Sequence, residues 1–291
     1  MNNLGVDLGG TNIKVALVSP QGELLAQRNR PTPQGVDPEK ICRYIADLCQ
    51  ELMKDEQIGA VGVGCPGTID GGVVRYSNNL GWHDFEMQKY MQRLLGLPVV
   101  IGNDANVAAL GEALVGCGKG AYSTVVLTLG TGVGGGVVLD GRLLTGYTGA
   151  ASEPGHMVIL DTSDAPLCTC GRRGCLESLA SATALVRMTK EAMCIYPDSL
   201  LCNCIGPGGV DGRTAFEAVR LGDRAAKEVV NRYIHYLAVG VANLINIFSP
   251  QVVGLSGGVA NQGEHLLRPL RHAVEPMVFG HAYALKKTCI T

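Results

Sequence analysis

A chain of 291 residues is long for one hydrophobic core and comfortable for two domains. A formal net charge of -2, with acidic and basic residues mixed along the chain, gives no electrostatic basis for binding nucleic acid or an anionic membrane. No apolar run reaches the length of a membrane span, and no signal-peptide pattern opens the chain. The 11 cysteines are an odd number, which favours a reducing compartment, so we expect a cytoplasmic protein without disulfides.

The first part of the chain predicts an alternation of strands and helices. Asp37-Pro38 is typical of a helix start, and apolar residues then recur at helical spacing as far as Leu52. The expected elements are strands over residues 4–8, 13–18 and 23–26, a helix from 37 to about 52, a strand over 58–64, a helix over 84–95, a strand over 99–102 and a helix from 103 to about 115.

The second part of the chain follows the same order. Asp140-Gly141 predicts a tight hairpin turn, and Asp223 predicts the cap of a long helix that stops at Ser249-Pro250. The expected elements are strands over residues 124–129, 134–139 and 142–144, a helix from 178 to about 193, the long helix over 223–249, a strand over 252–255 and a helix from 261 to about 274.

An internal repeat relates the two parts. Each opens with a strand, a glycine turn, a second strand and a second turn (Gln21-Gly22 or Asp140-Gly141) followed by an apolar pair. The repeat predicts an α/β protein with two related lobes and a cleft between them. Glycines gather at 116–120, so we expect a smaller N-terminal lobe over 1–117 and a larger C-terminal lobe over 118–291.

The first glycine turn carries groups that suit a phosphate. Glycine lets backbone N–H groups approach a phosphate without a side chain in the way. Around Gly9-Gly10, Thr11 supplies a hydroxyl, Lys14 a cation, and Asp7 a carboxylate able to reach Mg²⁺ through water. The alternative for this turn, a tight hairpin without a ligand, stays open.

Two more glycine turns follow strands. Residues 130–136 formally contain G-x-G-x-x-G, but a dinucleotide site needs a helix after the glycines, and a strand is expected here. We therefore exclude a dinucleotide site. Gly257-Gly258 form the third turn, and the similarity of these turns favours nucleotide binding over ligand-free hairpins.

Asp104 is a candidate catalytic base. It follows a strand and begins a helix, so it is either a helix cap or a carboxylate that takes a proton from a hydroxyl during phosphoryl transfer, and both roles are compatible. Asn103 beside it and Asn78-Asn79 in a loop offer hydrogen bonds to sugar hydroxyls, although asparagines in loops are more often turn formers.

A short segment predicts a zinc site. His156, Cys168, Cys170 and Cys175 supply three thiolates and an imidazole, which fill a tetrahedral Zn²⁺ shell and leave no open position for catalysis. We therefore expect a structural zinc site, with three unligated thiols as the alternative. Cys202-x-Cys204 has no second pair in the sequence nearby and is interpreted as structural or incidental.

Together, these motifs resemble the ROK family of sugar kinases, repressors and uncharacterised reading frames, over residues 3 to about 285. The residues after the zinc segment, 181–185, are most similar to its bacterial glucokinases. The motifs that carry the resemblance are Asp7-x-Gly9-Gly10-Thr11-x-x-Lys14, Asn103-Asp104, Gly130-Thr131-Gly132-Val133-Gly134-Gly135-Gly136, Glu153-x-Gly155-His156 and Cys168-x-Cys170-Gly171-x-x-Gly174-Cys175-x-Glu177. The resemblance implies the two-lobed, actin-like, hexokinase-type ATPase fold with duplicated ribonuclease H-like lobes.

The resemblance also implies roles for individual residues. Asp104 matches the base that acts on the 6-hydroxyl of the sugar, and His156 both ligates zinc and reaches the sugar. The residues that match sugar-binding positions are Asn103, Glu153, His156 and Glu177, with Gly67, Asn79 and Gly132 as looser candidates. The nucleotide-binding candidates are Asp7, Gly9, Gly10, Thr11, Lys14, Thr131, Gly132, Gly257 and Gly258.

The expected function is ATP-dependent phosphorylation of a hexose, with D-glucose as substrate, glucose 6-phosphate as product, and Mg²⁺ and structural Zn²⁺ as metals. N-acetylmannosamine or another hexose is the rival substrate, and a sugar sensor without catalysis is the rival class. A repressor is disfavoured because the first turn starts at Gly9, which leaves no room for a DNA-binding helix-turn-helix. Family members usually continue past the position of Thr291 with a helix that packs back on the first lobe. We also expect a homodimer or a higher homo-oligomer.

Overall fold

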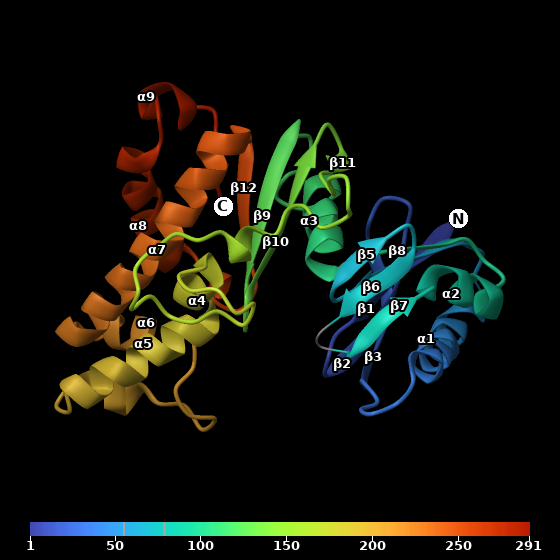
Figure 1. Cartoon of the computed structure of the whole chain (residues 1–291), viewed down its shortest axis with the longest axis horizontal. Coiled ribbons are helices and arrows are strands. Elements are labelled where there is room, and N and C mark those ends of the chain that lie inside the picture. The colour runs from blue at the N-terminus through green and yellow to red at the C-terminus, as the bar shows by residue number, and fades with distance from the viewer. Residues whose placement is uncertain (55, 78–79) are drawn as a thin grey trace. The chain divides into compact units, whose positions relative to one another are not determined.

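The computed structural model describes residues 1–54, 56–77 and 80–291, which form two compact units (Figure 1). Unit 1 comprises Met1–Gly111 and Leu144–Ser152, and unit 2 comprises Glu112–Leu143 and Glu153–Thr291. The division is thus discontinuous in sequence, whereas the glycine cluster predicted a single boundary. Helix α3 (Asp104–Leu114) runs across the first change from one unit to the other.

The two units contain sheets of the same topology. The order is β3-β2-β1-β4-β8 in unit 1 and β11-β10-β9-β12-β13 in unit 2, with five strands in each. In both sheets an antiparallel hairpin comes first and parallel strands follow. The internal repeat seen in the sequence is therefore a repeat of the fold.

The sheet of unit 1 consists of β1 (Asn2–Leu8), β2 (Asn12–Val18), β3 (Leu24–Pro31), β4 (Ile58–Cys65) and β8 (Val99–Asn103). Alternate residues of β1 and β2 are buried, as a strand with one face on the core requires. The parallel neighbours β1, β4 and β8 all end at the same edge, which places the residues that follow them side by side.

Two helices and a small sheet complete unit 1. Helix α1 (Pro38–Met53) begins at the predicted proline, and α2 (Met87–Leu95) begins later than expected because Asp84 belongs to a strand. That strand, β7 (Trp82–Phe85), pairs with β6 (Val73–Ser77), which pairs with β5 (Thr68–Asp70). Trp82 is buried in the core of the unit, so this small sheet is anchored by an aromatic side chain.

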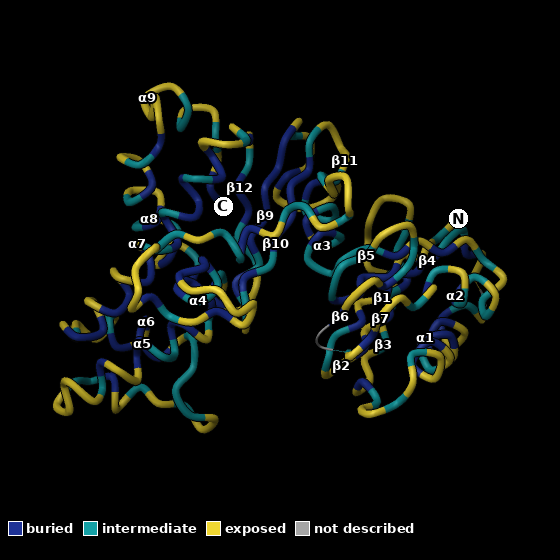
Figure 2. The backbone as a smooth tube through the Cα atoms, in the orientation of Figure 1, coloured by how far each residue is buried: buried dark blue, intermediate teal, exposed yellow. Residues whose placement is uncertain are grey.

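The sheet of unit 2 consists of β9 (Ser123–Leu129), β10 (Val133–Leu139), β11 (Arg142–Leu143), β12 (Val252–Ser256) and β13 (Cys289–Ile290). The inner strand β9 is buried along almost its whole length (Figure 2). The hairpin predicted at Asp140-Gly141 is confirmed, with φ of 49° and 70° at the two residues, as a type I′ turn requires.

Helices surround α7 in unit 2. Helix α7 (Arg224–Phe248) packs against α4 (Leu176–Ala180), α5 (Ala182–Ile195), α6 (Thr214–Arg220) and α8 (Glu264–Val274). The predicted cap of α7 is confirmed, since Asp223 accepts a hydrogen bond from the Ala226 N–H at 2.7 Å. The helix ends at Ser249, whose φ of 45° is left-handed, just before Pro250.

The prediction of one continuous helix over 178–193 in unit 2 is wrong. The helix expected over 178–193 is two helices, α4 and α5, which meet at Ser181. The Ser181 hydroxyl accepts a hydrogen bond from Ala184 N and caps α5, and the first N–H of α5, on Ala182, donates to Gly130 O at 2.8 Å. The break between α4 and α5 is therefore stabilised by a tertiary contact with Gly130, which the helical sequence pattern does not indicate.

The remaining elements are short. They are the 3₁₀ helices η1 (Pro154–His156), η2 (Leu200–Cys204), η3 (Ala260–Gln262) and η4 (Glu275–Met277), and helix α9 (His281–Ala284). Among residues 1–54, 56–77 and 80–291, none of the helices combines the length and the apolar character needed to cross a bilayer.

Candidate functional site

The parallel strands of unit 1 bring several predicted residues to one edge of the sheet. Asp7 pairs in register with Gly64, and Cys65 pairs with Asn103, at the carboxyl ends of β1, β4 and β8. The residues that follow these strands therefore lie next to one another. In open α/β sheets, this edge is where ligands bind.

Asp104 lies in the first turn of α3 at this edge and is half-buried. Burial raises the pKa of its carboxyl group, and the negative charge of Asp7 raises the pKa further. The Ala105 N–H, which donates to Asp104 Oδ1 at 2.9 Å, lowers the pKa of Asp104 and partly offsets the effect of burial. A carboxyl group with a raised pKa at a sheet edge is suited to accept a proton.

The cap of α3 is made by Asn103, so the alternative of Asp104 as the cap is wrong. Asn103 Oδ1 accepts a hydrogen bond from Asn106 N at 3.0 Å, the spacing of an N-cap. The other end of the same amide, Nδ2, donates to Gly67 O at 3.0 Å. Asn103 thus ties the loop after β4 to the start of α3.

Gly67 is a glycine for a structural reason. Its φ is 115°, and a Cβ atom there would clash with the carbonyl oxygen of Tyr76. The loop therefore passes close to β6 only because residue 67 has no side chain. Asn79, another of the looser sugar-binding candidates, lies outside the described residues.

The first glycine turn is braced by side chains that the sequence did not single out. Thr32 Oγ1 donates to Gly9 O at 2.6 Å, and Gln34 Nε2 donates to Gly10 O at 2.7 Å. A Cβ atom on Gly9 would lie 2.8 Å from Asn12 O, whereas Gly10 faces open space. The turn is thus held in one conformation by its carbonyl oxygens.

Two charged candidates lie at the same turn. The Lys14 ammonium lies 3.5 Å from the Asp7 carboxylate, and both side chains are more than half exposed. Thr11, at the tip, is exposed as well. An exposed ion pair of this kind contributes little to stability, so both charges remain available to a ligand.

The turns of unit 2 also lie side by side. Strands β9 and β12 are parallel neighbours, and Thr128 Oγ1 and Ser256 Oγ are hydrogen-bonded at 3.1 Å where the strands end. Gly257 has a φ of 88°, and a Cβ atom on it would lie 2.6 Å from Leu129 O. The turns after Leu129 and Ser256 therefore form one glycine-lined surface.

The start of α5 fixes the turn that contains Thr131 and Gly132. The turn closes with a hydrogen bond from Gly130 N to Gly132 O at 3.0 Å. Thr183 Oγ1 donates to Thr131 O at 2.8 Å, beside the bond from Ala182 N to Gly130 O. The first turn of a helix thus lies against a candidate phosphate-binding turn.

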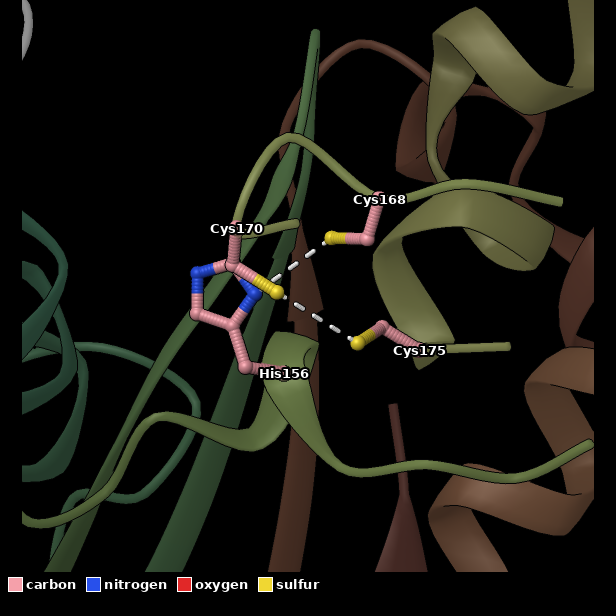
Figure 3. Close-up of side chains that lie close together, drawn as sticks. All are labelled: His156, Cys168, Cys170 and Cys175. Atoms are coloured by element: carbon pink, nitrogen blue, oxygen red, sulfur yellow. Dashed lines mark hydrogen bonds between the residues drawn. The ribbon is translucent and has the colours of Figure 1, made fainter. Parts of the chain in front are cut away.

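The four predicted metal ligands are brought together. One ligand atom from each of His156, Cys168, Cys170 and Cys175 lies within 4.8 Å of all the others. In Figure 3 the four side chains point toward a common centre, with His156 Nδ1 3.6 Å from Cys168 Sγ and Cys170 Sγ 3.7 Å from Cys175 Sγ. Three sulfurs and one imidazole nitrogen are a donor set that fits Zn²⁺.

The loop around these ligands suits a thiolate site. The pKa of the Cys170 thiol is lowered to about 6, first because the backbone N–H of Arg172 donates to it. Gly171 and Gly174 have φ of 85° and 71°, and a Cβ atom on Gly174 would clash with Leu160 O. The predicted role of both glycines in the tight turns of the loop is therefore physically required.

Glu153 and His156 are carried by η1, which packs on β10. A Cβ atom on Gly155 would clash with Val133 O, and one on Gly135 would lie 2.5 Å from Pro154 Cγ. At least part of the glycine run 130–136 therefore exists for packing against this turn. The Glu153 side chain is exposed, and His156 is half-buried.

Glu177 lies between the metal-binding loop and the glycine turn. Its Oε2 accepts a hydrogen bond from Val133 N at 3.2 Å, and its Oε1 accepts one from Thr169 Oγ1 at 2.7 Å. Thr169 and Val133 lie within the sequence motifs, but neither was a candidate site residue. The candidate residues are divided between the units: Asp7, Gly67, Asn103 and Asp104 belong to unit 1, whereas Thr131, Glu153, His156 and Glu177 belong to unit 2.

Comparison with known proteins identifies the fold and the family of this chain. Solved ROK hexokinases share the mixed α/β fold, which is the two-lobed, actin-like ATPase fold. Residues 3–289 match the sequence profile described as "ROK family". The chain therefore belongs to the ROK family.

Three relatives illustrate the similarity. The chain is 42% identical to a glucokinase of Thermotoga maritima, over 93% of this chain and 86% of the relative. It is 38% identical to a glucokinase of Halalkalibacterium halodurans, over 98% and 86% of the two chains. A crystal structure of a ROK family glucokinase from Streptomyces griseus in complex with glucose and AMPPNP superimposes with a TM-score of 0.81 at 33% identity, over 96% of this chain and 90% of that one.

Proposed function

We propose that this protein transfers the γ-phosphoryl group of ATP to a hexose, with D-glucose as the substrate and glucose 6-phosphate as the product. The observation that carries the proposal is the similarity to glucokinases at 42% and 38% identity along nearly the whole chain. The half-buried Asp104 supports it independently, because phosphoryl transfer to a hydroxyl needs a group that accepts the hydroxyl proton.

In the proposed reaction, Asp104 accepts the proton of the sugar 6-hydroxyl. The hydroxyl oxygen forms a bond to the γ-phosphorus while the bond from that phosphorus to the β-γ bridging oxygen breaks, and ADP leaves. The residues proposed to hold the sugar are Asn103, Glu153, His156 and Glu177, with Gly67, Asn79 and Gly132 as looser candidates. Since Asn103 already binds Gly67 and Asn106, its main contribution is to fix the loop and helix beside the base.

The three glycine turns are proposed to bind the nucleotide. Backbone N–H groups at Gly10, Thr131, Gly257 and Gly258 would meet phosphate oxygens or the ribose without interference from side chains. The Gly9 N–H donates to Asn12 O at 2.9 Å, so Gly9 would contribute by shaping the turn. The Thr11 hydroxyl and the Lys14 ammonium add donors, and Asp7 would contact the Mg²⁺ that accompanies ATP. The Lys14 ammonium, together with the Mg²⁺ that Asp7 would hold, would offset the charge that accumulates on the transferred group.

Zn²⁺ is proposed to bind His156, Cys168, Cys170 and Cys175. Four protein ligands fill its tetrahedral shell, so it would supply structural constraint and no reactive position. The metal would cross-link η1 to the loop that precedes α4. Because His156 Nδ1 faces Cys168, the other ring nitrogen of His156 remains available for a sugar hydroxyl.

A panel of hexoses tests the proposed activity. With ATP and Mg²⁺, we expect ADP release to depend on sugar, with a higher kcat/KM for D-glucose than for N-acetylmannosamine, mannose or fructose. An assay coupled to ADP formation measures this, with calorimetry of sugar binding in parallel. Binding of a sugar without ADP release would instead identify a sensor, and a preference for N-acetylmannosamine would replace glucose as the substrate.

The pH profile tests the role of Asp104. Only the ionised carboxylate accepts a proton, so kcat/KM should fall as the pH drops through the pKa of Asp104 in the free enzyme. Burial raises this pKa, so the acid limb should lie above the pH of about 3.9 expected for an ordinary aspartate. Measurement of kcat/KM for glucose against pH, with circular dichroism to verify folding, would contradict this role if the limb followed an unperturbed aspartate.

Cellular location and assembly are part of the proposal. We propose a reducing compartment such as the cytoplasm, because the 11 cysteines of the sequence are an odd number and three of them are proposed as zinc ligands. A homodimer or a higher homo-oligomer remains a prediction. Light scattering coupled to size-exclusion chromatography distinguishes either from a 30.5 kDa monomer.

A further inference from the structure

The Glu177 carboxylate joins two segments that are far apart in sequence. Its Oε2 accepts a hydrogen bond from the Val133 N–H, and its Oε1 accepts one from the Thr169 hydroxyl, at 3.2 Å and 2.7 Å. Val133 begins β10 immediately after the glycine turn, and Thr169 lies between two metal-ligand cysteines. One carboxylate therefore connects the metal-binding loop to the turn.

The connection to the turn is tight. Val133 is buried, so its backbone N–H has to be satisfied within the protein, and it donates to the Glu177 carboxylate. A Cβ atom on Gly132 would clash with Glu177 Oε2, so the carboxylate lies directly against the turn. A displacement of the carboxylate would therefore also displace the backbone of residues 132 and 133.

The connection to the metal-binding loop depends on Thr169. The Cys168 thiol also donates to Glu177 Oε1, at 3.4 Å, but an S–H group is a weak donor compared with a hydroxyl, and as a zinc thiolate Cys168 would have no proton to donate. The bond from Thr169 is short and charge-assisted, which places it among the stronger hydrogen bonds in proteins. Thr169 is exposed, and its hydroxyl also lies 4.0 Å from Cys168 Sγ, a longer contact than the one with Glu177.

We propose that Thr169 is a positioning residue, whose hydroxyl holds the Glu177 carboxylate in the orientation that binds the sugar and fixes the turn at Val133. The inference rests on the proposed kinase function, in which Glu177 contacts the sugar. Thr169 itself touches neither substrate. Its hydroxyl makes the metal-binding loop, and not only the metal ligands in it, part of the sugar site.

Three variants test the proposal. Thr169→Val removes the hydroxyl at nearly constant shape, and Thr169→Ser keeps it. Thr162→Val is a matched control, because the exposed Thr162 hydroxyl also donates to a carboxylate of the same segment, that of Asp164 instead of Glu177. For each protein we would measure zinc content, hydrogen–deuterium exchange of the peptide that contains Val133, and KM and kcat for glucose.

For Thr169→Val we expect exchange at Val133 to become faster and KM for glucose to rise, each by about ten-fold, with kcat within about two-fold of the original protein. Zinc content should be unchanged, and Thr169→Ser and Thr162→Val should behave like the original protein.

The proposal is overturned if Thr169→Val leaves both exchange and KM unchanged, or if it loses zinc, since the effect would then come from the metal. It is also overturned if Thr162→Val produces the same changes. If the original protein phosphorylates no hexose, the kinase function fails, but the exchange at Val133 still decides whether Thr169 positions Glu177.

Discussion

Replacement of Asp104 by asparagine should reduce turnover by about 10²–10⁴-fold, while the affinity for glucose stays within a few-fold. Asparagine keeps the size of the side chain and its hydrogen bond to the Ala105 N–H but cannot accept the hydroxyl proton. The measurement is kcat by ADP release, together with the dissociation constant of glucose by calorimetry. Unchanged turnover would remove Asp104 from the role of base.

The stability of the same variant separates loss of chemistry from loss of folding. Because burial raises the folded-state pKa of Asp104 above its unfolded value, the folded protein binds this proton more tightly. Stability from this group is therefore present at low pH and is lost as the pH rises through the folded-state pKa. At neutral pH, Asp104→Asn should melt at or above the temperature of the original protein. Asp47→Asn, on the exposed surface of α1, is the control for both measurements.

Features encoded by local chemistry could be predicted from the sequence. Asp223 followed by an apolar helical pattern predicts a capped helix, and Asp140-Gly141 predicts a type I′ hairpin, because each signal acts within a few residues. The repeat of strand, glycine turn and strand predicts two related sheets for the same reason, since each hairpin of the repeat is local.

Features that depend on tertiary contacts could not be predicted in this way. Strands β5, β6 and β7 are short, and Trp82 fixes them only by packing into the core of unit 1. The break between α4 and α5 depends on Gly130, which is 52 residues before Ala182 in the chain. Strand β13 has two residues and exists because Val252 and Val253 pair with it.

The candidate site shows the same division. The spacing of the cysteines was enough to predict the metal group, because three of its four ligands lie within one short loop. Thr32, Gln34 and Thr169 carry no sequence signal, since single hydroxyl and amide side chains occur everywhere on protein surfaces. Glycines in a turn can instead suggest a ligand site where none is needed. Gly135 is required by its close contact with Pro154, whether or not a ligand binds the turn.

Replacement of Cys170 by serine should release the metal and lower the melting temperature by about 10 °C. Cys170 is the exposed member of the group, so a serine there creates no cavity and adds no buried polar atom. The backbone N–H of Arg172 lowers the pKa of Cys170 to about 6, so its thiolate is populated at neutral pH, and serine supplies no comparable ligand. Elemental analysis and calorimetry measure the two effects.

The control for this variant is Cys202→Ser, which removes an exposed thiol of η2 outside the metal group. A zinc chelator should destabilise the original protein and Cys202→Ser by similar amounts and have little effect on Cys170→Ser, because that variant has no metal left to lose. If neither protein contains zinc and Cys170→Ser melts at the same temperature as the original protein, the zinc proposal is wrong. The four ligand atoms that lie within 4.8 Å of one another would then belong to ordinary packed side chains. The loop that carries Thr169 and Glu177 would then be held by hydrogen bonds alone, among them the bond from Arg172 to His156 O at 2.9 Å.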